Sequence, residues 1–259
     1  MQRSVRWGEL RAPELRDLAG TDAAVIVPVA SIEQHGPHLP TLTDTLLAET
    51  VAVRAAELAV ARGEPTVVTP PVWSGLSEHH MALGATLTLD FSAFLAVLGG
   101  IVRSLARHGF DRILFLNGHG GNIAALRVVV EELQRHHPDI RLVSATYWDL
   151  AGDLMNPVLA TQRTVRHACE AETSMLLALR PELVDPERLE EAAFPDVRDQ
   201  AKGPDDGSYR WRSFAAMTPS GALGDPRAAT AEKGERLLQL AAERLAEKLA
   251  EPVFWGEAA

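Results

Sequence analysis

Three short segments of the chain gather side chains of the types that bind metal ions and move protons. In the first, residues 31–40, Glu33 and His35 lie two positions apart, and Asp44 follows nine residues after His35. Residues two apart in an extended chain point to the same side, so Glu33 and His35 can face one point. With Asp44 they would form half of a divalent-metal site. A plainer interpretation is also open, in which Asp44 caps a helix and His35 is a turn residue.

The second segment, residues 117–122, has the sequence Asn-Gly-His-Gly-Gly-Asn and directly follows an apolar run. Open α/β sheets place their sites at the carboxyl ends of strands, which is where His119 would lie. Flanking glycines let the backbone turn tightly and bring His119 close to another group. The segment is not a dinucleotide loop, because Ile123 stands where that pattern requires a third glycine. The alternative is an ordinary strand–helix turn with an exposed histidine.

The third segment, residues 167–174, places His167, Glu170 and Glu172 at the start of an apolar helical run. Acidic residues are favoured in the first turn of a helix, which explains the two glutamates but not His167. Cys169 is most simply a small core residue. A Cys–His nucleophile is disfavoured, because acids on both sides would not lower the pKa of the thiol.

The nine histidines of the chain divide into two groups. Six lie in or beside these segments or in residues 77–81, where Ser77, His79 and His80 could line the site or bind a substrate. An imidazolium is favoured at a helix C-terminus. We therefore interpret the other three, which fall at the ends of predicted helices, as structural: His108, His136 and His137.

Strands and helices alternate along the chain, and they must position these segments. Apolar runs predict strands at residues 23–29, 66–69, 85–89, 112–116 and 140–146. Helical periodicity predicts helices at residues 46–61 (with Thr43–Asp44 as the N-cap), 91–108, 123–136 and 228–250. This alternation indicates a largely parallel sheet covered by helices on both faces.

Composition excludes several classes of protein. The chain has 259 residues, is 46% hydrophobic, carries a formal charge of −10 and contains one cysteine. A disordered chain, a disulfide framework and a cysteine-based zinc site are therefore excluded. The acidic balance argues against a nucleic-acid partner, which would need a basic face.

The chain also lacks an N-terminal signal core and any apolar stretch near the ~18 residues of a membrane span. We expect a soluble cytoplasmic protein. We also expect a single domain over residues 1–259, in which residues 190–225 form long loops over the sheet and part of a substrate lid.

Taken together, the motifs resemble those of the creatininase family of metal-dependent amidohydrolases, in register from about Trp7 to about Leu179. They are Glu33-x-His35-Gly36-Pro37-His38-Leu39-Pro40 with Asp44, Asn117-Gly118-His119-Gly120-Gly121-Asn122, His167 with Glu172-Thr173-Ser174, and a late Gly221-x-x-Gly224-Asp225-Pro226. The resemblance implies a three-layer αβα fold with a mostly parallel central sheet, two metal ions per subunit and a homo-oligomer, usually a hexamer.

The resemblance also implies roles for single residues. The matched metal ligands are Glu33, His35, Asp44 and His119, with Asp44 as the bridge, and we assign Glu172 as a further ligand. His167 matches the general acid/base, and Glu170 is a candidate to orient it. The candidate substrate-binding residues are Ser77, His79, His80, Gly120 and Arg163.

Two departures from the family pattern affect the substrate. Creatinine-hydrolysing members carry a Tyr-Glu pair after the site histidine, the Glu being a ligand, whereas this chain has Gly120 and Gly121. They also carry Trp-Asp before the catalytic histidine, where this chain has Arg163 and Thr164. We therefore do not expect creatinine as the substrate. Arg163 or Arg166 would suit a negatively charged one.

The resulting hypothesis is hydrolysis of a small cyclic or linear, non-peptide amide by a metal-bridging hydroxide, with zinc, manganese or iron as the metal. His167 would protonate the leaving nitrogen. An alternative is a deformylase or a peptide-trimming peptidase of a cofactor-biosynthesis pathway. A non-catalytic binding protein would predict loss of the ligand set, but only the position of Gly121 lacks its expected polar residue.

Overall fold

A parallel sheet of four strands forms the centre of the computed structural model, which describes residues 4–194 and 208–256. The strands are β1 (Ala24–Val29), β2 (Thr66–Val68), β3 (Arg112–Asn117) and β4 (Arg141–Thr146), in the order β2-β1-β3-β4. All neighbouring strands are parallel, and every residue of β1 and β3 is buried. Such continuous apolar strands suit a sheet that is covered on both faces.

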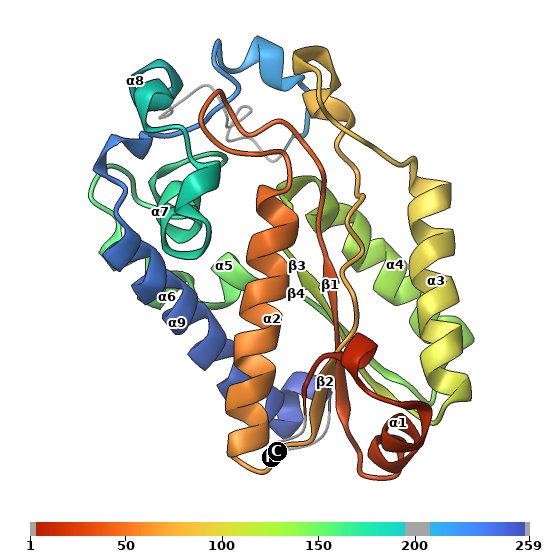
Figure 1. Ribbon diagram of the computed structural model, residues 1–259. Coiled ribbons are helices and arrows are strands. Elements are labelled where there is room, and N and C mark those ends of the chain that lie inside the picture. The colour runs from red at the N-terminus through yellow and green to blue at the C-terminus, as the bar shows by residue number, and fades with distance from the viewer. Residues whose placement is uncertain (1–3, 195–207, 257–259) are drawn as a thin grey trace.

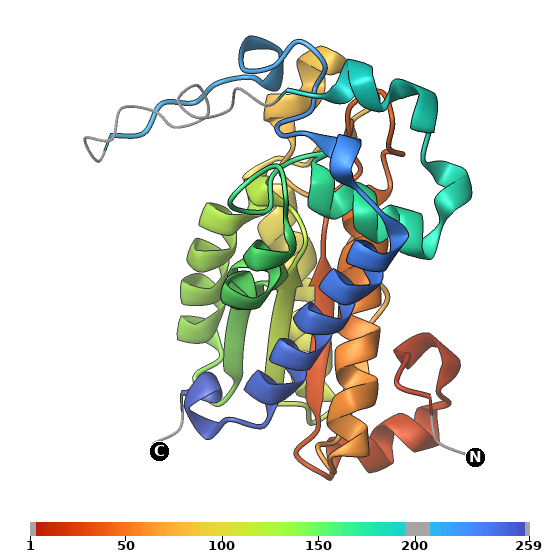
Figure 2. The same ribbon diagram turned by 90° about the vertical axis from the view of Figure 1, so that its left-hand side faces the viewer.

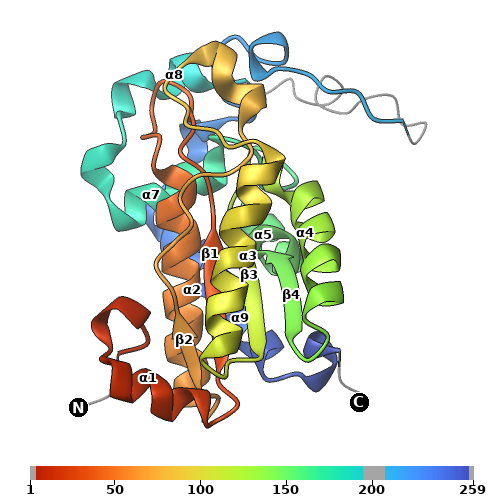
Figure 3. The same cartoon turned by 90° about the vertical axis from the view of Figure 1, so that its right-hand side faces the viewer.

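Helices cover both faces of the sheet and complete a three-layer αβα sandwich, as predicted (Figure 1). One apolar core joins the sheet to α2 (Thr43–Ala61), α7 (Glu170–Leu179) and α9 (Ala231–Leu249). In Figure 2, α2 and α9 lie side by side on this face. The other core joins it to α1 (Ala12–Ala19), α3 (Phe91–Arg107) and α4 (Ile123–His136). Figure 3 shows α3 and α4 on that face.

Shorter helices connect these layers. They are α5 (Tyr147–Leu150), α6 (Gly152–Met155) and α8 (Leu189–Ala192), and three 3₁₀ turns near the site are η2 (Glu78–Leu83), η3 (Gly120–Asn122) and η7 (Phe214–Ala216). Residues 195–207, which belong to the predicted loop-rich segment and lid, lie outside the described residues. Within the described ranges, no helix is both long and apolar enough to cross a membrane.

Two local predictions were wrong. Residues 85–89 do not form a strand: Leu87 and Thr88 make only isolated bridges, to Ile32 and Gly75, and Ala85 adopts a left-handed φ of 51°. The segment is a loop held by these two bridges, although apolar and polar residues alternate along it as in a strand. The predicted cap of α2 is also wrong, because the N-cap is Leu42 and no side chain caps the helix. Asp44 lies in the first turn, and its carboxylate is available for other contacts.

The connections create a crevice at the carboxyl ends of the two central strands. After β1 the chain leads to α2 on one face, whereas after β3 it leads to α4 on the other face. Ligand sites of open α/β sheets lie where neighbouring connections diverge in this way. The first turns of α2 also pack on bare backbone, because a Cβ added to Gly118 would lie 2.7 Å from Ala48 Cβ and 3.0 Å from Asp44 O. This packing brings Asp44 beside His119.

Candidate metal centre

Carboxylates and imidazoles converge at this crevice from four parts of the fold. Glu33 and His35 follow β1, Asp44 lies in the first turn of α2, His119 follows β3, and Glu172 lies in the first turn of α7. All five side chains are buried. The structure therefore brings together every residue that we assigned as a metal ligand.

The first group that could hold an ion consists of Glu33, Asp44 and His119, whose ligand atoms lie within 4.8 Å of one another. His119 Nδ1 is 2.9 Å from Glu33 Oε2 and 3.1 Å from Asp44 Oδ2. The ring is held in place from its other side, where Nε2 lies 3.2 Å from the carbonyl oxygen of Leu76.

The second group consists of His35, Asp44 and Glu172, again within 4.8 Å. His35 Nε2 is 3.1 Å from Asp44 Oδ1 and 3.8 Å from Glu172 Oε2. Asp44 belongs to both groups and turns one carboxylate oxygen toward each histidine. Asp44 could therefore contribute a ligand atom to either group.

Buried atoms without partners test whether these residues fit metal ions. Among the described residues, His35 Nε2 and Asp44 Oδ2 are buried and make no hydrogen bond. The 3.1 Å contact between His35 and Asp44 lacks the alignment of one. Buried polar atoms are nearly always satisfied, so their convergence on common points fits a cation better than it fits an apolar core. Nitrogen and oxygen ligands of this kind suit zinc, manganese or iron.

The carboxylates strongly perturb the titration of their neighbours. Burial alone would lower the pKa of His35, but the carboxylates of Asp44, Glu172 and Glu33 raise it to about 9. The pKa of His119 is likewise raised, against burial, by Glu33 and Asp44. Burial and repulsion from Asp44 raise the pKa of Glu172 to about 8. Bound protons thus compensate the clustered negative charge, and a divalent ion could replace them.

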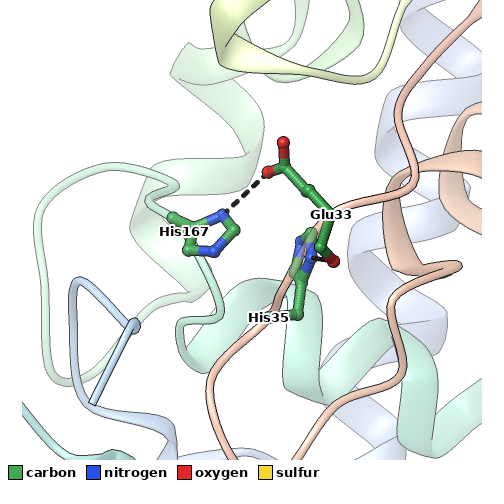
Figure 4. A group of neighbouring side chains, drawn as sticks. All are labelled: Glu33, His35 and His167. Carbon is green, nitrogen blue, oxygen red and sulfur yellow. Dashed lines mark hydrogen bonds and ion pairs between the residues drawn. The ribbon is translucent and has the colours of Figure 1, made fainter. Parts of the chain in front are cut away.

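His167 lies at the edge of this cluster with both ring nitrogens in defined contacts. Figure 4 shows its Nδ1 facing Glu33, 3.3 Å from Oε1. Its Nε2 is 2.9 Å from the carbonyl oxygen of Gln34, which makes Nε2 the protonated nitrogen. Burial, together with His35 and His80, lowers the pKa of His167 well below its usual value. The lowered pKa favours a neutral imidazole, and the carbonyl oxygen of Gln34 favours the tautomer with its proton on Nε2.

The residues predicted to bind substrate take different positions. Ser77 Oγ donates to Glu33 Oε2 at 2.9 Å and lies 3.1 Å from His119 Nε2, so it holds two candidate ligands. His79, His80 and Gly120 line a cavity of about 340 Å³ that opens on the cluster. Arg166 also lines it, whereas Arg163 is exposed and is not among the described lining residues.

We had predicted that Glu170 orients His167, but the structure places its carboxylate elsewhere. Its carboxylate accepts hydrogen bonds from Ala160 N, from the backbone and hydroxyl of Thr161, and from Lys233 Nζ at 2.5 Å. Its described contacts do not include His167. Burial would raise the pKa of Glu170, but Lys233 and Thr161 lower it. Glu170 is thus a fully paired carboxylate that ties α7 to α9 and to residues 160–161.

Two residues at the site were not predicted. Gln34 lies between two candidate ligands in the first motif and is buried; its Nε2 is 2.7 Å from His80 Nδ1 and 3.0 Å from Gly221 O. Its place inside the motif was a signal for this role. Phe214 stacks on His80 with ring centroids 3.9 Å apart, but it belongs to a segment without sequence periodicity.

The sequence and the fold both match known proteins. Residues 8–249 match the family model Creatininase, described as creatinine amidohydrolase. The chain is 34% identical over 236 residues to mycofactocin precursor peptide peptidase of Mycobacterium ulcerans, covering 89% of this chain and 86% of the relative. It is 30% identical to creatinine amidohydrolase of Pseudomonas putida, covering 97% and 98%.

A solved structure of creatinine amidohydrolase superposes with a TM-score of 0.80 at 29% identity, covering 95% of this chain and 96% of that one. Similar creatininase structures include a manganese form and a zinc form. The chain belongs to the creatininase family and is a metal-dependent amidohydrolase.

Proposed function

We propose that the chain hydrolyses a peptide bond in a short or precursor peptide, and that it does so with two divalent ions. Glu33, Asp44 and His119 would hold one ion, and His35, Asp44 and Glu172 the other. The observation that carries the proposal is Asp44, whose two carboxylate oxygens face the two histidines at 3.1 Å each. When bound, the ions supply an acidified water and polarise the amide carbonyl.

His167 moves the proton in this proposal. Its neutral Nδ1 takes a proton from the attacking water and passes it to the leaving nitrogen of the amide. Its Nε2 stays bonded to the carbonyl oxygen of Gln34, which fixes the orientation of the ring. Ser77 holds Glu33 in place from outside the cluster.

The environment of Gly121 supports a ligand set that differs from that of the creatinine-hydrolysing members. A Cβ added there would lie 2.3 Å from Leu76 O and 2.4 Å from His119 Nε2, so the position has no room for a carboxylate side chain. Glu172 would complete the second group with His35 and Asp44. A peptide substrate also agrees with the relative named mycofactocin precursor peptide peptidase.

A small amide is the second candidate substrate. The cavity of about 340 Å³ is large enough for one, and the identity to creatinine amidohydrolase extends over 97% of the chain. Arg166 on the cavity wall suits a carboxylate on either kind of substrate. We also propose that the protein is cytoplasmic and that it forms a homo-oligomer, the latter as the family resemblance implies. Light scattering measures the mass of the assembly.

Incubation of the purified chain with a mixture of synthetic decapeptides, and separately with creatinine, tests the proposal. We expect mass spectrometry to detect peptide cleavage after loading with manganese or zinc, and its loss after chelation. Creatinine turnover without any peptide cleavage would contradict the peptidase assignment. Cleavage that survives complete removal of metal would contradict the metal site.

A further inference from the structure

A second and larger cavity adjoins the candidate metal centre. Its volume is about 770 Å³, against about 340 Å³ for the cavity at the cluster. The two cavities share five lining residues: His79, Gly120, Gly121, Ile123 and Met217. They therefore adjoin each other, and together they are larger than a small amide needs. We call the larger part the outer groove.

The walls of the outer groove are largely apolar and aromatic. Its lining includes Leu89 and Phe91 from one segment of the chain and Tyr209 and Trp211 from another. The exposed fractions of Tyr209 and Trp211 are 88% and 56%, which is high for large aromatic side chains. Exposed apolar surface along a groove marks a binding site more often than it marks chance exposure.

Two glycines lie where the two cavities adjoin. Among the residues that the structure describes, none has an atom within 4 Å of a Cβ added to Gly120. At the neighbouring Gly121 no side chain fits. Gly120 therefore places no side chain between the outer groove and the cavity at the cluster.

Charges of both signs lie in the outer groove. Its lining includes Arg210 and Arg212, from the same segment as the two aromatic residues, and also Glu78 and Asp90. One carboxylate oxygen of Asp90 already accepts from Ala93 N at 2.8 Å and caps α3. Because the groove carries charges of both signs, charge does not favour one kind of ligand. Its apolar and aromatic lining favours apolar side chains of a ligand.

We propose that the outer groove binds the part of a peptide substrate that lies beyond the scissile bond, by packing one of its aromatic or aliphatic side chains against Trp211. This inference rests on the proposed peptidase function and extends it to a substrate class: extended peptides with an apolar residue several positions from the cleaved bond. Large, stiff aromatic side chains provide such contacts at a small cost in conformational entropy.

The test compares a decapeptide that contains one tyrosine with a dipeptide amide that contains the same scissile bond. We expect Trp211→Ala to lower the ratio of their kcat/KM values about three- to ten-fold, the size of an aromatic packing contact. Trp73→Ala is the matched control, because Trp73 is 51% exposed but lines neither cavity. An equal ratio in wild type and Trp211→Ala overturns the inference.

Binding to the metal-free protein separates this inference from the proposed function. We expect fluorescence anisotropy of a labelled decapeptide to show weaker binding to Trp211→Ala than to wild type or Trp73→Ala. Such binding without hydrolysis after metal loading would support the groove and refute the peptidase function. Hydrolysis with no dependence on Trp211 in either assay would refute the groove and leave the peptidase function standing.

Discussion

Two glutamates in the first turn of α7 lie two residues apart and have opposite electrostatic environments. Glu170 accepts hydrogen bonds from Ala160, Thr161 and Lys233, and its pKa is lowered. Glu172 accepts one from Ala168 N and faces other carboxylates, and its pKa is raised to about 8. Both are buried. The comparison shows that a buried charge with enough donors is structural, whereas one without them marks a place for a cation.

The largest expected effect distinguishes the two glutamates by activity. Glu172→Gln should lower kcat/KM at least about 100-fold, because a neutral amide replaces a charged ligand. Elemental analysis should show less bound metal. Glu170→Gln should keep its metal content and serves as the control. The comparison fails if Glu172→Gln retains both metal and activity.

For the free energy of unfolding, we expect the larger loss at Glu170 rather than at Glu172. Glu170→Gln should lower the free energy of unfolding by about 3 kcal/mol, because it leaves Lys233 without its buried partner. Chemical denaturation of the metal-free protein measures this. Glu235→Gln is the control, since Glu235 pairs with Arg54 at the surface and should cost less than about 1 kcal/mol. Equal costs for the two variants would remove the distinction between a buried and an exposed pair.

The pH dependence of stability should also differ between Glu170 and the cluster that contains Glu172 and His35. The raised pKa values of Glu172 (about 8) and His35 (about 9) mean that the folded metal-free protein binds protons more tightly than the unfolded chain. Stability from these groups should therefore fall as pH rises from about 5 to about 9. The lowered pKa of Glu170 has the opposite effect: the stability that this carboxylate contributes to the folded protein is lost as the pH falls into the acid range.

Thermal unfolding across this pH range measures both trends. Metal loading should remove the alkaline loss, because the ions replace the protons at His35 and its neighbours. The acid loss linked to Glu170 should persist with metal. An alkaline trend that is the same with and without metal would show that the clustered carboxylates do not control it.

The smallest expected effect concerns Ser77, which contacts Glu33 and His119 from outside the cluster. Ser77→Ala should weaken metal affinity about ten-fold, as loss of an outer hydrogen bond to a ligand commonly does. Titration calorimetry measures the affinity. Ser104→Ala on the exposed face of α3 is the control and should leave it unchanged. Unchanged affinity in Ser77→Ala would restrict the ligand-holding contacts to the carboxylates themselves.

Sequence patterns predicted the layers well, and they named the candidate ligands that the fold brings together. The helix at residues 123–136 has the predicted bounds, because its apolar spacing faces one core. The ligand candidates were predictable because Glu33, His35 and Asp44 are close in sequence and His119 follows a buried strand. Parallel strands necessarily bring their carboxyl ends to one edge.

The remaining errors share a physical cause, which is dependence on partners far away in the sequence. Glu170 and Glu172 both suit a helix start, and they are separated by partners far away in the fold, such as Lys233 on α9. The same holds for Arg163 and Arg166, since the sequence alone does not show which arginine faces the cavity. The alternation at residues 85–89 is that of a strand, but no neighbouring strand lies alongside it to pair with.

The candidate ligands come from distant parts of the chain, and this has a consequence for local unfolding and degradation of the protein. Glu33, His119 and Glu172 belong to segments that local unfolding could detach separately. Ions held by all three would cross-link these segments and close long loops, so opening any one of them would require releasing metal. The first turn of α7 should then exchange its amide hydrogens, and yield to proteases, far more slowly with metal than without it.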